Sequence, residues 1–286
     1  MKKKLILFIM TMFLATPAFA NCDYASMCAK PYSLSSTPAR VFSNITGATY
    51  IGQTVAQSII KKQLKKATKE NFSVKVKAYS LQDLKAGKFK YLKVAGKNLN
   101  FDGIATSRLE FNTLCDFNYV DLKTNTFMEN MVLNFSTEIS DSDLKKTMQS
   151  SGYLDVLNNI SFSSMGINFV KFSGADVSVK NGKVYFIIHV TSPLLLGKKQ
   201  LDINIGSDVK VEDGKIVLTK IDLENSFAKI DLSKITSLLN SINPLSFTTN
   251  ILGDKGTTVD VRNVRIVGDR ILVTGNVIIP KGTKIK

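Results

Sequence analysis

The chain contains 286 residues, of which 38 are Lys or Arg, 23 are Asp or Glu and one is His, and its formal net charge is +15. This length suits one large domain or two small ones. Three cysteines and a single histidine supply few ligands for a zinc site, so we expect neither a metal nor another cofactor. The basic character points instead to an anionic partner, either a nucleic acid or the surface of an anionic membrane.

The first twenty residues have the three parts of a secretory signal peptide. Lys2–Lys4 supply the charged part, Leu5–Leu14 form an apolar run, and Ala18–Ala20 has the small-residue pattern of a cleavage site. The apolar run is too short to anchor the chain stably across a bilayer. We therefore predict cleavage after Ala20 and export of a mature chain to the periplasm or to the outside of the cell.

Export argues against a nucleic-acid partner. Removing the three lysines of the leader lowers the net charge from +15 to +12. A basic exported protein meets phospholipid headgroups and anionic envelope polymers far more often than DNA. No later apolar run approaches the roughly 20 residues of a transmembrane helix, so we expect only peripheral contact with an anionic membrane.

The start of the mature chain contains two of the three cysteines, and we expect it to be loose. Cys22 and Cys28 could close a small loop in an oxidising compartment, which would leave Cys115 unpaired inside an apolar strand. Cys22 is not expected to carry a lipid, because Asn21 is not the small residue that a lipoprotein signal requires. The stretch up to about Pro38 is rich in Ser, Thr and Pro, and we expect residues 21–44 to form a loose arm.

A long helix is predicted from Ala48 to Lys69. Its apolar residues fall within one broad arc at about 100° per residue, which a curved sheet could cover. We expect the apolar groove for lipid to include Ile51, Val55, Ile59, Ile60 and Leu64. Five lysines lie among them, at positions 61, 62, 65, 66 and 69. Lys61, Lys62, Lys65, Lys66 and Lys69 either form an ordinary solvated face or contact lipid headgroups, and the sequence leaves both open.

The rest of the chain alternates apolar and polar residues, as strands do. After a strand at residues 72–79 we predict a short helix capped by Ser80 and ended by Gly87, and then strands within residues 88–103, 107–122 and 131–139. A helix capped by Asp141 or Ser142 follows, at about residues 143–157. Three hairpins are predicted at the turns 181–182, 213–214 and 268–269, with a further helix at 232–242.

These elements predict an α+β fold that is mainly antiparallel β. We expect residues 45–286 to form a single domain in which a strongly curved antiparallel sheet wraps around the long N-terminal helix. Short helices lie at the turns. A long antiparallel sheet twists, and its apolar inner face must be covered; the predicted helix is the only element long enough to cover much of it.

Three segments resemble the LmeA-like phospholipid-binding family of exported bacterial proteins. They are "SLQDLKAGKFKYLKVAGKNLNFDGIATSRLEF" at 80–111, "SDSDLKKTM" at 140–148, and "INPLSF" at 242–247 followed by "VRNVRIVGDRILVTGNVII" at 261–279. The resemblance implies a fold similar to the tubular lipid-binding domains, with an apolar groove for acyl chains. It implies no catalytic residue, and no fixed lipid-contacting motif that could be assigned to positions of this chain.

Catalytic signatures are weak. His189 is the only histidine, it shares a strand face with Tyr185 and Ile187, and no G-x-S-x-G motif accompanies it, so we interpret it as a structural residue. Asp141 and Asp143 resemble a metal-binding pair, but they precede a helix whose amide groups such carboxylates cap. Convergence of Asp141, Asp143 and His189 in one cleft would favour an enzyme acting on envelope glycolipids. We therefore expect a protein that is not an enzyme.

Two functions remain. The first is a protein that binds or shuttles a phospholipid or related acyl lipid in an apolar groove. The alternative is a structural or assembly protein of the cell envelope, with a solid core and no lipid cavity.

Overall fold

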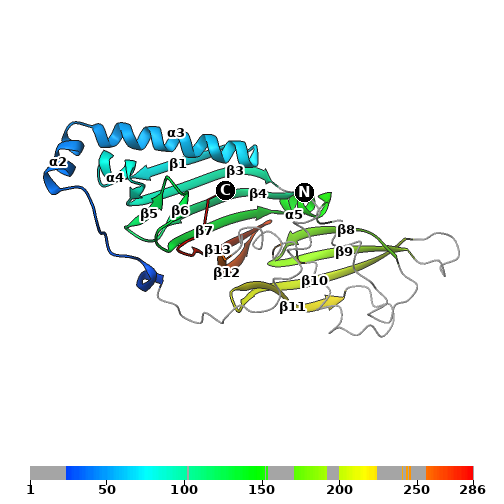
Figure 1. Ribbon diagram of the computed structural model, residues 1–286. Coiled ribbons are helices and arrows are strands. Elements are labelled where there is room, and N and C mark those ends of the chain that lie inside the picture. Colours follow the sequence, from blue (N-terminus) through cyan, green and yellow to red (C-terminus); the bar gives the residue numbers. More distant parts are fainter. Residues whose placement is uncertain are drawn as a thin grey trace.

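The computed structural model describes residues 24–101, 103–151, 153, 171–191, 200–223, 240, 243, 245 and 256–285. The fold is α+β, with mainly antiparallel sheets and few helices (Figure 1). The described helices are a 3-10 turn η2 (Tyr24–Met27), α2 (Thr37–Ile45), α3 (Ala48–Thr68), α4 (Leu81–Lys85) and α5 (Asp141–Met148). The expected leader and the helix at 232–242 lie outside the described residues.

The largest sheet has six antiparallel strands in the order β1-β3-β4-β7-β13-β12. Their bounds are β1 (Phe72–Lys77), β3 (Tyr91–Phe101), β4 (Ile104–Thr113), β7 (Met131–Ser140), β12 (Thr258–Val267) and β13 (Arg270–Ile279). Strand β1 buries Phe72, Val74 and Val76 and exposes the residues between them. The predicted alternation is therefore confirmed, and it gives this edge of the sheet one apolar face.

A second sheet has four antiparallel strands in the order β11-β10-β9-β8. These are β8 (Lys171–Lys180), β9 (Lys183–Thr191), β10 (Gln200–Glu212) and β11 (Lys215–Leu223), while β2 (Lys88–Phe89), β5 (Asn118–Asp121) and β6 (Thr126–Phe127) form a small third sheet. All three predicted hairpins are confirmed. Asn181-Gly182 and Asp213-Gly214 have positive φ at both turn residues, which suits a tight hairpin turn.

Helix α3 lies along the β1 edge of the six-stranded sheet (Figure 1) and also contacts α2 and α4. The predicted helix is confirmed almost to the residue, and Lys69 ends it with φ +64°. Thr49 is its one buried residue, so the sheet covers only part of the helix. The expected wrapping of a strongly curved sheet around this helix is not confirmed, because the contacts of α3 with the sheet are mainly to β1.

One apolar core joins the six-stranded and four-stranded sheets. Its buried residues come from both sheets and from α5, for example Phe135, Leu144 and Phe186. Two backbone donors tie these parts together: Val179 N–H of β8 donates to the Asp141 carboxylate of α5 at 3.0 Å, and Val261 N–H of β12 donates to the Gly214 carbonyl at 2.9 Å. A second core, behind α3, is built on the apolar face of β1.

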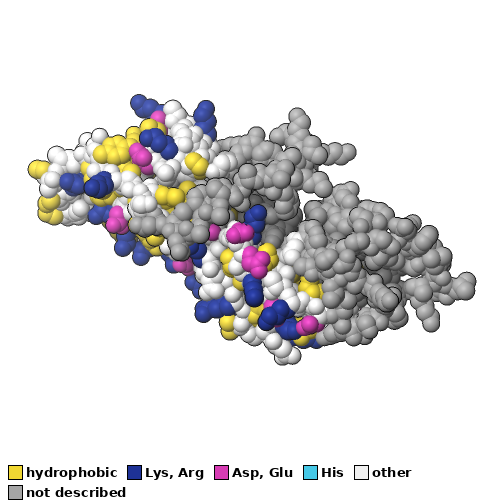
Figure 2. Space-filling model, turned by 90° about the horizontal axis from the view of Figure 1, so that it is seen from below, with side chains coloured by type: hydrophobic (Ala, Val, Ile, Leu, Met, Phe, Trp, Pro, Cys, Tyr) yellow, Lys and Arg dark blue, Asp and Glu magenta, His cyan; other side chains and the backbone are white. Residues whose placement is uncertain are grey.

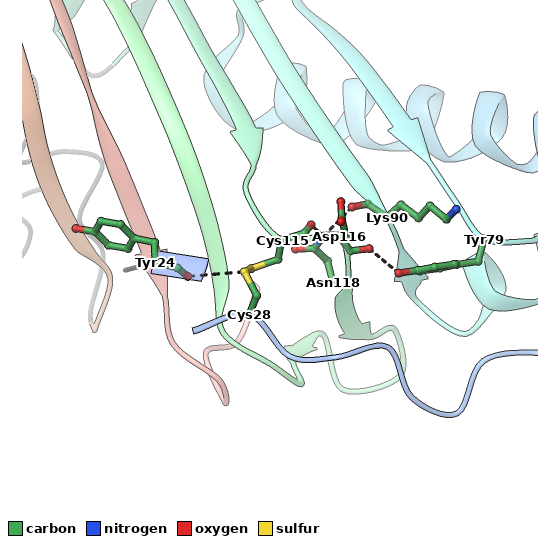
Figure 3. Close-up of a disulfide and its surroundings, with 7 residues drawn as sticks. All are labelled: Tyr24, Cys28, Tyr79, Lys90, Cys115, Asp116 and Asn118. Carbon is green, nitrogen blue, oxygen red and sulfur yellow. Dashed lines mark hydrogen bonds between the residues drawn. A yellow bond between two sulfur atoms is a disulfide. The ribbon is translucent and has the colours of Figure 1, made fainter. Parts of the chain in front are cut away.

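Cys28 is bonded to Cys115, with the two Cα atoms 5.4 Å apart (Figure 3). The expected Cys22–Cys28 pairing is therefore wrong, as is the expectation that Cys115 is a free thiol within a strand. Cys115 lies two residues beyond the end of β4, in a loop that Asn118 braces by donating to the Cys115 carbonyl at 2.9 Å. The sequence could not select this partner, because the two cysteines are 87 residues apart and meet only in the fold.

The segment that we expected to be loose is held by several contacts from Tyr24 onward. Tyr24 is buried and its hydroxyl donates to Asp260, while the Lys88 ammonium donates to the Ser33 carbonyl. Ser35 donates to Asp83 through both its backbone N–H (2.6 Å) and its hydroxyl (2.8 Å). The chain from Thr37 then forms α2, so the described part of the arm is a strap fixed to the sheet.

We expect loss of the Cys28–Cys115 bond to lower the free energy of unfolding by about 2–5 kcal/mol, because the bond closes a long loop in the unfolded chain. Urea unfolding of a Cys28→Ser/Cys115→Ser variant measures this difference. Cys22→Ser is the control and should unfold like the wild type. A large loss in the control, with none in the double variant, would contradict the pairing.

Candidate lipid-contacting surface

The five apolar residues predicted to line a groove are divided between two sides of α3. Ile60 and Leu64 are half-buried and pack on the core behind the helix, beside Phe72 and Val74 of β1. Ile51, Val55 and Ile59 are exposed, with 64%, 53% and 56% of their surface accessible. At 100° per residue these three fall on the side of α3 opposite to Ile60 and Leu64. The sheet thus covers only the side of the predicted apolar arc that carries Ile60 and Leu64, and not the whole arc.

Helix α2 adds three further exposed apolar residues at the same end of the molecule (Figure 1). Val41, Phe42 and Ile45 are 51%, 71% and 81% accessible. Hydrophobic side chains gather at this end in the space-filling view (Figure 2). With Tyr50 and the exposed residues of α3, they form a surface that we call the apolar tip. It is defined by Val41, Phe42, Ile45, Tyr50, Ile51, Val55 and Ile59.

The side chains of the five lysines are exposed. None of Lys61, Lys62, Lys65, Lys66 and Lys69 forms an ion pair with a carboxylate among the described residues. A lysine without a carboxylate partner keeps its full charge available to an external anion. The C-terminal half of α3 is therefore a cationic surface directly beside the apolar tip.

Asp141 and Asp143 both lie in the first turn of α5. Ser140, and not the predicted Asp141 or Ser142, is the N-cap: Asp143 N–H donates to its hydroxyl at 3.2 Å, and Ser140 N–H donates back to the Asp143 carboxylate at 2.9 Å. Asp141 accepts from Val179 N–H. The capping interpretation is therefore confirmed for Asp143, whereas the Asp141 carboxylate bonds β8 and pairs with Lys145.

His189 lies between two carboxylates on one face of the four-stranded sheet. Its Nδ1 is 2.7 Å from Asp202 and its Nε2 is 3.2 Å from Asp176. The hydrogen bond to Asp202, assisted by Asp176, raises the pKa of His189 above its ordinary value of 6.5, although partial burial opposes the shift. Both ring nitrogens can donate when the ring is protonated, so this group stabilises the sheet most in its charged form.

His189 and the acidic residues of α5 do not share a cleft. Asp141 contacts β8 at Val179, whereas His189 faces β8 at Gly174, five residues and about 17 Å away along the strand. Within the described part of the chain, no three His, Cys, Asp or Glu side chains are grouped so that they could hold a metal ion. The arrangement needed for glycolipid hydrolysis is therefore not formed by these three residues.

Exposed apolar side chains beside cationic ones are typical of a surface that contacts a partner protein, a ligand or a membrane. A family model for LmeA-like phospholipid-binding proteins matches residues 45–276, so the chain belongs to this family. No curated protein and no solved structure matches the chain. None of the described helices combines the length and hydropathy of a membrane span.

Sequence reasoning missed α2 and its part in the apolar tip. The signal was present: Pro38 follows Thr37, a residue order typical of a helix start, and Val41, Phe42 and Ile45 recur at helical spacing. The many Ser and Thr residues around this stretch favour a loop instead. In the structure Ser43 faces inward and bonds the Thr49 hydroxyl at 2.8 Å.

We expect the stabilising effect of His189 to depend on pH. Because the folded-state pKa is raised, the contribution is complete below the unfolded value near 6.5 and is lost as pH rises through the folded value. His189→Gln should therefore lower the melting temperature more at about pH 5.5 than at about pH 9. An equal loss at both pH values in thermal unfolding would contradict the pairing with Asp176 and Asp202.

Proposed function

We propose that this protein is an exported phospholipid-binding protein that carries its lipid without catalysing a reaction. The observation that carries the proposal is its membership of the LmeA-like phospholipid-binding family over residues 45–276. In this proposal residues 45–286 form one lipid-binding domain. The acyl chains lie on the side of α3 that faces β1, beside Ile60 and Leu64, and the lysines of α3 bind the phosphate.

Export is part of the same proposal and has separate support. The leader predicted at residues 1–20 directs the chain out of the cytoplasm, to the periplasm or the outside. The Cys28–Cys115 bond supports this, because disulfides persist in oxidising compartments and are rare in the cytosol. The positive charge supports a membrane or lipid partner in that compartment and argues against nucleic acid.

A structural or assembly role in the envelope is the second candidate. One observation favours it: Phe72, Phe89, Leu99 and Leu109 are all buried in the core behind α3. Side chains that fill this space take the place that acyl chains would occupy. The two candidates differ in whether the purified protein contains lipid.

We expect protein purified from cells after export to retain a phospholipid. Native mass spectrometry should show a mass above that of the polypeptide, and solvent extraction followed by lipid analysis should identify the class. An unrelated exported protein of similar charge, purified in parallel, controls for lipid carried over from membranes. Protein that is lipid-free in every preparation would favour the structural role.

The lysines of α3 supply a second prediction. Lys61→Gln/Lys62→Gln/Lys65→Gln/Lys66→Gln should fold normally, because all four side chains are exposed and without ion pairs among the described residues. We expect its binding to anionic vesicles to weaken at least tenfold, since each lysine near an anionic surface contributes about 1 kcal/mol. Vesicle sedimentation at low and high salt measures the difference, which should shrink as salt screens the charges.

A matched control removes four lysines elsewhere. Lys123→Gln/Lys146→Gln/Lys210→Gln/Lys215→Gln has the same net charge, and all four residues are exposed. This control should bind vesicles more strongly than the α3 variant. Equal binding by the two variants would show that net charge, and not the position of α3, governs the interaction.

A further inference from the structure

Exposed large apolar residues are concentrated on the two adjacent helices α2 and α3. Twelve such residues occur in the described part of the chain, and seven of them form the apolar tip, between residues 41 and 59. Single exposed apolar residues are normal on protein surfaces, but a cluster marks a surface that another apolar phase covers. The clustering of exposed apolar residues on α2 and α3 therefore calls for one explanation that applies to both helices.

The outward direction of these side chains is fixed by hydrogen bonds on the opposite side of α2. The Ser43 hydroxyl contacts the Thr49 hydroxyl at 2.8 Å and accepts from Leu81 N–H at 3.1 Å. Ser43 is buried by these contacts. Phe42 and Ile45 lie on the other side of the same helix, so α2 could bury them only by losing the two bonds of Ser43.

On α3 the exposed side changes from apolar to basic along the helix. Ile51, Val55 and Ile59 occupy one side over about 12 Å, and Lys62 and Lys66 continue on that side toward the C-terminal end. The helix thus presents an apolar end and a cationic end in the same direction. A solvated face of a soluble domain is polar along its whole length.

The two helices that carry the tip have charged residues of a single sign. From Tyr24 to Lys69 the sequence contains no Asp or Glu, whereas Arg40 and the five lysines of the α3 region lie within or next to the two helices. A second copy docked on the same face by two-fold symmetry would bring these cations against one another. An anionic lipid surface offers both the opposite charge and an apolar interior.

We propose that the apolar tip is the membrane-docking surface of this protein: Phe42, Ile45 and the exposed side of α3 insert into the outer few ångströms of an anionic bilayer, and Lys62 and Lys66 contact its headgroups. The proposal deepens the lipid-binding function proposed above and rests on it. Interfacial segments of this kind bury their apolar side by about 5–10 Å. Docking in this orientation holds α3 and the adjoining edge strand β1 next to the lipid surface.

The absence of tryptophan from the sequence provides a direct test. Phe42→Trp introduces a single fluorophore into the tip, and Leu122→Trp places one at an exposed position outside the apolar tip. With vesicles of phosphatidylglycerol and phosphatidylcholine, we expect emission of the Phe42→Trp variant to shift to shorter wavelength and to be quenched by brominated acyl chains. The Leu122→Trp variant should keep the emission of a solvated tryptophan.

Flotation of the full exported chain with the same vesicles measures the energetic effect. Phe42→Ser/Ile45→Ser should partition onto vesicles at least about tenfold more weakly than the wild type, because two apolar side chains no longer insert. Leu122→Ser/Val267→Ser removes two other exposed apolar residues, 57% and 54% accessible, and should bind like the wild type. Circular dichroism establishes that both variants are folded.

Three results would overturn the docking proposal. The first is wild-type affinity in Phe42→Ser/Ile45→Ser. The second is unshifted emission from Phe42→Trp while the protein is bound to vesicles. The third is a wild-type dimer that Phe42→Ser/Ile45→Ser abolishes, together with no vesicle binding, which would assign the tip to a second copy. Bound lipid in native mass spectrometry reports the proposed function separately, so either conclusion can fail alone.

Discussion

Helix α3 meets the six-stranded sheet mainly at its edge strand β1, and an edge can bury only one side of a helix. Ile60 and Leu64 use that side, together with the buried Thr49. The apolar residues on the other side remain more than half exposed to solvent. Each apolar side chain left exposed forgoes about 1.5–3 kcal/mol of burial. The position of α3 on an edge therefore decides which of its residues stabilise the fold and which are available to a ligand or a membrane.

The N-terminal strap covers part of the side of the six-stranded sheet that α3 does not cover. Near one end of β7, Met131 faces the core behind α3, while Val132 faces the opposite side, and both are buried. The strap supplies the cover for Val132 through Tyr24 and the Cys28–Cys115 bond. It then continues directly into α2. The strap thus fixes the apolar tip in place, because the contacts of Ser35 and Ser43 hold α2 against α4.

Local signals in the sequence predicted the local structure well. The alternation in β1, the Asn-Gly and Asp-Gly turns and the long helix depend on neighbours in the chain, and all are found where expected. Apart from α2, whose local signal was present, the failures concern contacts between distant segments. The Cys28–Cys115 bond depends on where the strap crosses the sheet, which no spacing encodes. The apolar arc of α3 spans roughly 220°, more than a sheet edge can cover, so periodicity alone could not say which part is buried.

The apolar residues beside the lysines of α3 determine the orientation in which the helix can meet an anionic surface. Cations alone attract any anionic surface in many orientations, and their effect falls off within about 8–10 Å at moderate salt. Apolar residues alone would favour self-association as readily as a bilayer. On α3 the apolar and the basic residues lie on the same side of the helix, one group after the other along its axis, with Ile59 next to Lys62. Only a surface that is apolar inside and anionic at its boundary satisfies both at once, and it does so in a single orientation of the helix.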